Sequence, residues 1–288
     1  MQDRQNFTLS DGRNLEYLTN GLKSDSVIIL HAGTTQDITG WQTWLDYFVS
    51  QGIFALSFGR SGYAASTKKP GRITLDVAKD VAELSEHLGI KRFVNLGLSG
   101  GGQHAIATGL DSRSVGVVTV GSLAPFAELG QRFYDGMQQA DLDEYADALR
   151  DINDLIRRFQ GWQDGNLADS VAGAELSERD QLATTKPTWK VVLDSCAFTM
   201  QQGWDWVADD YSSYLQPWGF DPRDVKAPTV IWQAELDKNV PVQHGKWLAE
   251  HMPNNHFELR AGESHLGLYV NYEEEIMQSA IELISKGK

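Results

Sequence analysis

The sequence predicts an α/β fold, in which helices cover both faces of a mostly parallel β-sheet. Short apolar runs rich in β-branched residues, such as SVIILH at Ser26–His31 and SVGVVTVG at Ser114–Gly121, alternate along the chain with segments of helical periodicity. This alternation is typical of strands joined by helical crossovers. The runs are continuous rather than alternating in polarity, which indicates strands buried on both faces of the sheet.

Each strand is expected where a β-rich run is bounded by turn residues. An opening hairpin is expected at Phe7–Ser10 and Leu15–Thr19, because the turn pair Asp11-Gly12 separates the two runs. The later strands are expected at Ser26–His31, Ile53–Leu56, Phe93–Gly97, Ser114–Gly121, Ala227–Gln233 and His256–Arg260.

Helices are expected between these strands. In Trp41–Val49 and Leu75–Leu88 the large apolar residues recur at helical spacing, and Gly89 ends the second of these helices. Further helices are expected to begin near Gly101 and to span Val242–Met252 and Tyr272–Ser285.

The alternation of strands and helices stops over residues 126–217. Polar and charged helical stretches, such as DLDEYADALRDINDLIRRF, replace it, and several tryptophans accompany them. This segment is expected to form a helical cap that is inserted into the sheet domain. The prediction therefore assigns residues 1–125 and 218–288 to the core domain and residues 126–217 to the cap.

Composition narrows the classes of function. The 288-residue chain is 41% hydrophobic and 22% charged, as expected of a globular protein, and its formal net charge is −14. Nucleic-acid binding is not expected, because it depends on clustered Lys and Arg side chains. No apolar run approaches the roughly 18 residues of a membrane span, so neither membrane insertion nor export is expected.

The single cysteine, Cys196, permits no internal disulfide, which agrees with a reducing compartment. We therefore expect a cytoplasmic protein. The expected partner is a small-molecule substrate, and the expected assembly is a monomer or a homodimer.

A serine surrounded by glycines follows the predicted strand Phe93–Gly97. Gly97-Leu98-Ser99-Gly100-Gly101 fits the pattern Gly-x-Ser-x-Gly between a strand and a helix, which is the context of a nucleophile elbow. So sharp a turn strains the backbone of the serine and leaves no room for side chains on its neighbours. The hydroxyl of Ser99 is then exposed above the carboxyl ends of the strands, where open α/β sheets bind ligands.

A serine hydroxyl is a weak nucleophile until a base accepts its proton. The chain has seven histidines. His265 is the expected base, because it follows the predicted strand His256–Arg260 on a loop that leaves the sheet at the edge where Ser99 should lie. His31, also at a strand end, is expected to brace a loop, and His104 is expected to point away from the reaction.

The base needs an acid that holds its tautomer and stabilises the imidazolium. Asp237 is the expected acid, because it lies in the loop after the predicted strand Ala227–Gln233. Glu235 in the same loop is the alternative. The other position from which an acid could act, after Ser114–Gly121, carries Ser122 in place of a carboxylate.

An oxyanion hole needs two backbone N–H donors. The amide of Gly100 is expected at the start of a helix, where an anion is favoured. The second donor is expected from the loop HAGTT after Ser26–His31, through the amide of Gly33 or that of Thr34.

Together these features resemble the α/β-hydrolase superfamily over nearly the full length of the chain. The order Ser99, Asp237, His265 is the order in which that family places its catalytic residues. The segment HLGIKRFVNLGLSGGGQHA resembles its helix, strand and elbow, FGRSGYAAS resembles a glycine-rich loop with an arginine, and IWQAELDKNVPVQHG resembles its acid loop. Three residues depart from the family pattern without touching the expected catalytic side chains: Gly59, Ala32 and Ala234.

The resemblance implies a two-step acyl transfer that requires neither a metal nor an organic cofactor. Ser99 would attack a carbonyl carbon, and water would later release the acid. A serine at this position argues against the family's dehalogenases and epoxide hydrolases, because those enzymes use an aspartate nucleophile.

The expected activity is hydrolysis of a small, largely apolar carboxylic ester that is held under the cap. The side chains expected to line the substrate pocket are Thr34, Leu98, Phe133, Met137, Trp189, Phe198 and Met200.

Other uses of the same three residues stay open at this point: an aminopeptidase, an amidase, a carbon–carbon bond hydrolase or a hydroxynitrile lyase. An aminopeptidase would need cap carboxylates for a substrate ammonium group, and the candidates are Glu128, Asp135, Asp141 and Glu144. A non-catalytic ligand receptor is the remaining alternative, because a fold alone does not establish an activity.

Overall fold

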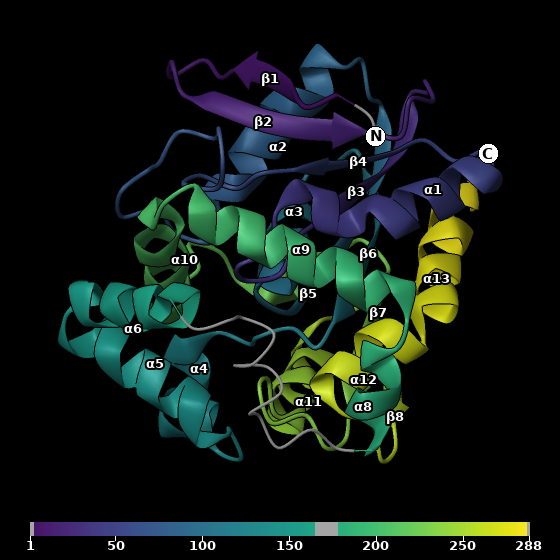
Figure 1. Cartoon of the computed structure of the whole chain (residues 1–288). Coiled ribbons are helices and arrows are strands. Elements are labelled where there is room, and N and C mark those ends of the chain that lie inside the picture. The colour runs from purple at the N-terminus through teal and green to yellow at the C-terminus, as the bar shows by residue number, and fades with distance from the viewer. Residues whose placement is uncertain (1–2, 165–177, 287–288) are drawn as a thin grey trace.

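The structure of the protein is a computed structural model that describes residues 3–164 and 178–286. Residues 165–177 of the predicted cap lie outside this part of the chain. An eight-stranded sheet has the order β1-β2-β4-β3-β5-β6-β7-β8, and helices surround it (Figure 1). The strands are β1 (Gln5–Thr8), β2 (Asn14–Thr19), β3 (Ser26–His31), β4 (Ala55–Phe58), β5 (Arg92–Leu98), β6 (Ser114–Val120), β7 (Thr229–Ala234) and β8 (Asn255–Arg260).

The pairing of the strands brings their carboxyl ends to one edge. β1 and β2 form the predicted antiparallel hairpin, and β2 pairs antiparallel with β4, whereas the pairs from β4 to β8 are parallel. His31 at the end of β3 lies opposite Gly97 of β5, and Gln233 of β7 lies opposite Leu259 of β8. The loops after these four strands therefore gather at the same edge, which is where such sheets bind ligands.

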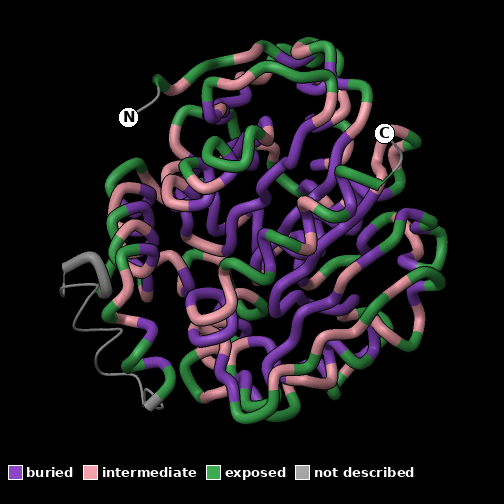
Figure 2. Tube along the Cα trace, turned by 90° about the vertical axis from the view of Figure 1, so that its right-hand side faces the viewer, coloured by how far each residue is buried: buried purple, intermediate pink, exposed green. Residues whose placement is uncertain are grey.

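Helices bury both faces of the sheet. In β3, Ile28 packs in a cluster with residues of α1 and α13, while its neighbour Val27 packs in a cluster with residues of α2. Successive side chains of a strand point to opposite faces, so a strand covered on both sides must be apolar throughout. Figure 2 shows the buried residues running through the middle of the molecule. The helices around the sheet are α1 (Gln42–Ser50), α2 (Asp76–His87), α3 (Gly102–Thr108), α11 (Val242–His251) and α13 (Glu273–Ser285).

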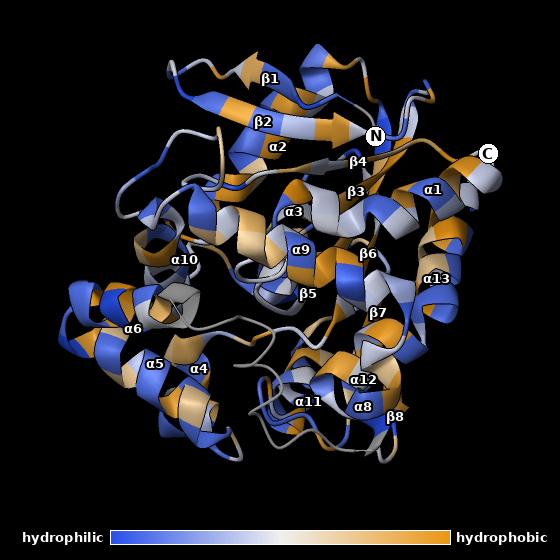
Figure 3. Ribbon diagram, viewed as in Figure 1, coloured by the Kyte–Doolittle hydropathy of each residue, from blue (hydrophilic) through white to orange (hydrophobic). Residues whose placement is uncertain are grey.

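A series of helices separates β6 from β7. Figure 1 shows α5 and α6 far from β1 and β2, and Figure 3 shows many hydrophilic residues along both helices. None of the helices within residues 3–164 and 178–286 is long and apolar enough to cross a membrane. The helices of this region are α4 (Phe126–Leu129), η3 (Gly130–Tyr134), α5 (Gln139–Arg150), α6 (Ile152–Asp164), α8 (Glu178–Thr184), α9 (Pro187–Gln201) and α10 (Asp205–Leu215).

The predicted fold class is confirmed, and several details differ from the sequence expectation. β1 spans Gln5–Thr8 rather than Phe7–Ser10, and β7 begins at Thr229 rather than at Ala227. β4 begins at Ala55 rather than at Ile53, because the Ile53 N–H still donates to the carbonyl of Phe48 in the turn after α1. A short helix that was not expected, α12 (His265–Asn271), begins directly at His265. Its first turn is capped by the Ser264 hydroxyl, which accepts a hydrogen bond from the Gly267 N–H.

Candidate active site

Ser99 lies in a strained turn between β5 and the short helix η2 (Ser99–Gly101), which leads into α3. Its φ angle is 51°, in the left-handed region that residues with a side chain seldom adopt. A Cβ atom on Gly97 would lie 2.6 Å from the carbonyl oxygen of Gly101, so no side chain fits there. The positive φ of Ser99 and the lack of space at Gly97 therefore agree with the sharp strand-to-helix turn that the sequence predicts.

Asp237 and His265 meet at the carboxyl edge of the sheet. Nδ1 of His265 lies 2.7 Å from Oδ2 of Asp237, whose side chain is fully buried. The other oxygen, Oδ1, accepts hydrogen bonds from the backbone N–H groups of Asn239 (2.9 Å) and Val240 (2.8 Å). The carboxylate is therefore held in place by its own loop, and it in turn orients the imidazole.

The charge of Asp237 changes the acid–base properties of His265. Burial opposes protonation of the imidazole, but the negative charge and the hydrogen bond of Asp237 outweigh it and raise the pKa of His265 above its ordinary value. With the Nδ1 proton directed at Asp237, Nε2 is the nitrogen that can accept a proton from a nucleophile.

The other buried histidines have structural contacts. Nε2 of His31 lies 3.1 Å from Oδ1 of Asn95, and burial lowers the pKa of His31 to about 3. His244 accepts a hydrogen bond from the Ala124 N–H at its Nδ1 (3.1 Å), and burial lowers its pKa to about 4. The pKa of His104 is also lowered by burial. These imidazoles are poor proton acceptors, in contrast to His265.

The loop after β3 lies beside the serine. A Cβ atom on Gly33 would lie 3.6 Å from Cβ of Ser99. The Gly33 N–H, one of the expected oxyanion donors, donates to Oε1 of Gln36 at 3.0 Å. An oxyanion would therefore have to replace Gln36 as the acceptor, a competition that the loop sequence did not indicate.

A cavity of about 990 Å³ opens at this edge of the sheet. Ser99, Gly33, Gly100 and His265 all contribute to its lining. The side chain of Asp237 does not line it and reaches it only through its hydrogen bond to the imidazole. The structure thus brings all five predicted catalytic and oxyanion residues to one place.

Four of the predicted pocket residues also line this cavity: Thr34, Leu98, Trp189 and Met200. On α9, the lining residues recur at helical spacing: Trp189, Val192, Leu193, Cys196 and Met200. A single stripe of this helix therefore faces the cavity.

Three predicted pocket residues do not line the cavity. Phe198 falls on another side of α9, where the guanidinium of Arg4 stacks on its ring at 4.3 Å. Phe133 is fully buried against the ring of His244 and the aromatic residues around it, with centroids 4.8 Å apart. Met137 belongs to the same packed cluster. These three side chains pack against other residues instead of lining the cavity. Residue type alone does not distinguish the two roles.

Two carboxyl groups of α5 line the cavity. Asp141 accepts a hydrogen bond from Nδ2 of Asn239 at 3.1 Å, and burial raises its pKa to about 6. Burial and the nearby Asp141 raise the pKa of Glu144 to about 8, and the hydroxyl of Tyr211 donates to it. Of the four cap carboxylates named for an aminopeptidase, Asp141 and Glu144 line the cavity, whereas Glu128 and Asp135 do not.

The described residues contain no group of three or more His, Cys, Asp or Glu side chains that could hold a metal ion.

Comparisons with known proteins agree with this fold. Residues 25–272 match the family described as alpha/beta hydrolase fold. A non-heme chloroperoxidase from Streptomyces lividans is 29% identical over 146 residues, which is 49% of this chain and 53% of that protein. The chain thus matches about half the length of this curated relative.

Solved structures share the fold over almost the whole chain. The enol-lactonase of Burkholderia xenovorans superposes with a TM-score of 0.71 at 16% identity, covering 98% of this chain and 100% of the other. A thermophilic esterase from Thermogutta terrifontis superposes with a TM-score of 0.70 at 19% identity, covering 99% and 98%. The protein belongs to the alpha/beta hydrolase fold family.

Proposed function

We propose that this protein is a serine hydrolase that cleaves small, largely apolar carboxylic esters with Ser99, His265 and Asp237. The observation that carries the proposal is the 2.7 Å contact between His265 and Asp237 beside a cavity that Ser99 also lines. The family and the related structures support hydrolase activity in general. An enol-lactonase and an esterase of similar fold support an ester as the substrate class.

In the acylation step, Nε2 of His265 accepts the proton of the Ser99 hydroxyl as Oγ attacks the ester carbonyl carbon. Negative charge develops on the carbonyl oxygen, and the amides of Gly100 and of Gly33 or Thr34 stabilise it. Each such donor contributes about 10²–10³ in rate. The tetrahedral intermediate then collapses, the protonated imidazole gives its proton to the departing alkoxide, and an acyl-enzyme remains.

In the deacylation step, a water molecule takes the place of the alcohol. His265 accepts a proton from this water as its oxygen attacks the acyl carbon, and the same amides hold the oxyanion. Collapse of the second intermediate returns the proton to Oγ of Ser99 and releases the carboxylic acid. Asp237 stays ionised throughout and stabilises the imidazolium in both steps.

The apolar stripe of α9 supports an apolar substrate. Trp189, Val192 and Met200 form part of the cavity wall. The described helices between β6 and β7 would act as the cap that holds the substrate over Ser99, and a cavity of about 990 Å³ is large enough for a drug-sized ester.

The direct test is hydrolysis of p-nitrophenyl esters from acetate to decanoate by the wild-type protein and by Ser99→Ala. Ser122→Ala is the matched control, because Ser122 is a buried serine after the neighbouring strand β6 and its hydroxyl donates to the Leu123 carbonyl. We expect Ser99→Ala to abolish release of nitrophenol and Ser122→Ala to retain it. Equal release by wild type and Ser99→Ala would contradict the proposal.

An aminopeptidase is the second candidate, because Asp141 and Glu144 are carboxyl groups within the cavity. Their raised pKa values oppose it, since burial favours the neutral acid over the anion that would bind an ammonium group. Comparing amino-acid p-nitroanilides with their N-acetylated forms distinguishes the candidates. An esterase would not prefer the free amine, whereas an aminopeptidase would require it.

A further inference from the structure

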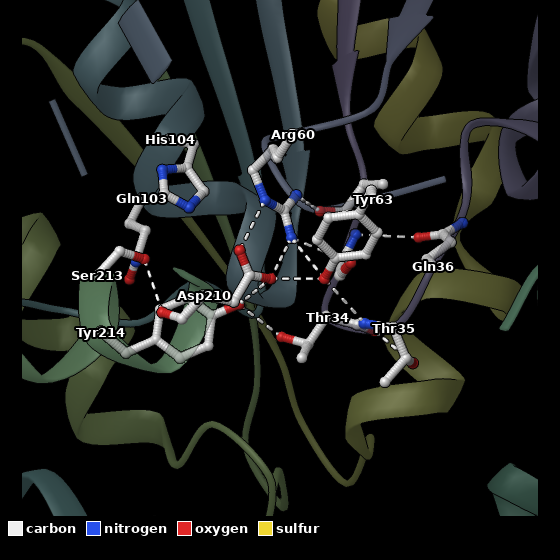
Figure 4. Close-up of polar contacts among 12 residues, drawn as sticks. Thr34, Thr35, Gln36, Arg60, Tyr63, Gln103, His104, Asp210, Ser213 and Tyr214 are labelled. Atoms are coloured by element: carbon white, nitrogen blue, oxygen red, sulfur yellow. Dashed lines mark hydrogen bonds and ion pairs between the residues drawn. The ribbon is translucent and has the colours of Figure 1, made fainter. Parts of the chain in front are cut away.

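A buried ionic cluster joins α10 to the glycine-rich loop that follows β4 (Figure 4). The carboxylate of Asp210 is fully buried and accepts hydrogen bonds from Nε (3.1 Å) and Nη2 (2.6 Å) of Arg60. It also accepts from the hydroxyls of Tyr63 (2.6 Å) and Tyr214 (2.9 Å) and from Nη2 of Arg72. Burial alone would raise the pKa of Asp210, but the two guanidinium charges hold it well below its usual range.

The same cluster reaches the oxyanion loop, defined here as residues 32–36. Nη1 of Arg60 donates to the carbonyl oxygen of Ala32, and its Nη2 lies 3.4 Å from the carbonyl oxygen of Gly33. One guanidinium therefore binds the Asp210 carboxylate and two successive carbonyls of the loop. The planar, five-donor fork of arginine allows this double engagement, which a lysine ammonium cannot reproduce.

Two tyrosines of the cluster hold the tip of the oxyanion loop. The Tyr63 hydroxyl accepts a hydrogen bond from the Thr35 N–H at 3.2 Å, and the Tyr214 hydroxyl lies 2.7 Å from Oγ1 of Thr34. Figure 4 shows both hydroxyls beside the Asp210 carboxylate. Each tyrosine thus links the same buried anion to one residue of the loop.

The oxyanion loop requires such restraint because its backbone is strained. Thr35 has a φ of 66°, which is a genuine outlier for a β-branched residue. Such conformations cost about 1–3 kcal/mol and persist only where surrounding contacts determine them. Hydrogen bonds of Arg60, Tyr63 and Tyr214 tie this loop to Asp210.

We infer that Asp210 and Arg60 are positioning residues for the oxyanion hole, so that α10 controls transition-state stabilisation through the oxyanion loop. This inference rests on the proposed function, because the loop has a catalytic role only if an oxyanion forms at Ser99. Neither residue lines the cavity. Their loss should therefore lower kcat while leaving substrate affinity nearly unchanged.

Arg72 provides a matched control within the same cluster. It is as deeply buried as Arg60, at 1% against 3% exposure, and it donates to the same carboxylate. Its other described side-chain contact is with Nε2 of His104 on α3, at 3.4 Å, and not with the oxyanion loop. Changes at Arg72 and at Arg60 therefore disturb the same buried anion but differ in their effect on the loop.

The experiment compares Arg60→Lys with Arg72→Lys, each of which keeps the buried positive charge. We expect Arg60→Lys to lower kcat for a p-nitrophenyl ester about 10- to 100-fold with KM changed less than about threefold, because a small displacement of the oxyanion loop weakens only transition-state contacts. Arg72→Lys should keep kcat within about threefold of wild type. Equal losses of kcat in both variants, or an unchanged kcat in folded Arg60→Lys, would overturn the inference.

Tyr63→Phe tests the same inference if Arg60→Lys does not fold. This change deletes one oxygen atom, which contacts Asp210 and the Thr35 N–H, and Tyr63 does not line the cavity. The expected result is again a lower kcat with KM nearly unchanged. An unchanged kcat in the folded variant would contradict the positioning role.

Amide hydrogen exchange separates this inference from the proposed function. A peptide that covers residues 32–36 should exchange faster in Arg60→Lys than in Arg72→Lys or wild type, whether or not an ester is turned over. If wild type shows no Ser99-dependent turnover, the proposed function fails, and faster exchange would still support the restraint of the loop. If turnover occurs but exchange and kcat are unaffected in Arg60→Lys, the inference fails and the proposed function remains.

Discussion

Nδ1 of His265 lies 2.7 Å from Oδ2 of Asp237, and this contact leaves Nε2 as the imidazole nitrogen that would accept the proton of Ser99 in the proposed mechanism. The carboxylate is held by two backbone amides of its own loop, those of Asn239 and Val240. The tautomer that places the proton on Nδ1 is therefore favoured, and Nε2 is free to accept a proton. Proton transfer from Ser99 in the proposed mechanism depends on this orientation of the imidazole.

Asp237→Asn should lower kcat by about 10⁴, because an amide in this position favours the wrong imidazole tautomer. Glu235→Gln is the control, since Glu235 lies in the same loop but accepts from the Gly262 N–H at 2.9 Å. Steady-state ester hydrolysis measures both variants. A larger loss of kcat in Glu235→Gln than in Asp237→Asn would show that Glu235, and not Asp237, is the acid.

The pH dependence follows from the raised pKa of His265. A base must be neutral to accept a proton, so kcat/KM falls as the pH drops through its pKa. Because Asp237 raises that pKa, the midpoint of the acid limb should lie above about 6.5, the ordinary histidine value. A pH–rate profile of the free enzyme provides the check, and a rate that stays constant down to pH 5 would be incompatible with this role.

The two faces of α9 should respond differently to truncation. Met200→Ala enlarges the cavity, so the preferred acyl chain should become longer. Phe198→Ala removes a side chain that contacts Arg4 outside the cavity, so the preferred chain length should stay the same. Relative kcat/KM across the p-nitrophenyl ester series measures the shift. The same shift of the preferred chain length in both variants would contradict an orientation of α9 in which Met200 faces the substrate and Phe198 faces away from it.

Loss of the Glu144 proton should lower the free energy of unfolding as the pH rises. The pKa of this acid is raised to about 8 in the folded protein, so between about pH 5 and 8 the folded state binds more protons than the unfolded state. Stability therefore falls with pH across this window. The Tm of Glu144→Gln minus that of wild type should increase from pH 5 to 8 and then level off.

The exposed Glu275 supplies the control for this measurement. Glu275→Gln removes the same charge at the surface, so its Tm difference from wild type should be smaller across that range. A Tm difference in Glu144→Gln that does not change with pH would show that Glu144 titrates normally.

The sequence predicts the parts of the structure that depend on local pattern. β3 is recognisable because a strand covered on both faces must be apolar throughout, and the elbow is recognisable because Gly97 has no room for a side chain. Asp237 and His265 follow β7 and β8, so parallel pairing alone predicts that they meet. These features require no knowledge of how distant helices pack.

Features that depend on tertiary packing could not be predicted in the same way. Phe198 and Met200 are both apolar residues of α9, and only the docking of the helix decides which one faces the cavity. Asp210 stands in the acidic sequence DWVADDYSSY, which is also compatible with a solvated surface. Its burial depends on Arg60 and Arg72, which are far away in the sequence.

The most direct measurement is the intact mass of the native protein after reaction with a fluorophosphonate, followed by peptide mapping. We predict a single covalent label on Ser99, no label in Ser99→Ala, and much slower labelling in His265→Ala, because Oγ then lacks its base. A native protein that takes up no label, or that carries the label on another residue, would contradict the assignment of Ser99 as an activated nucleophile.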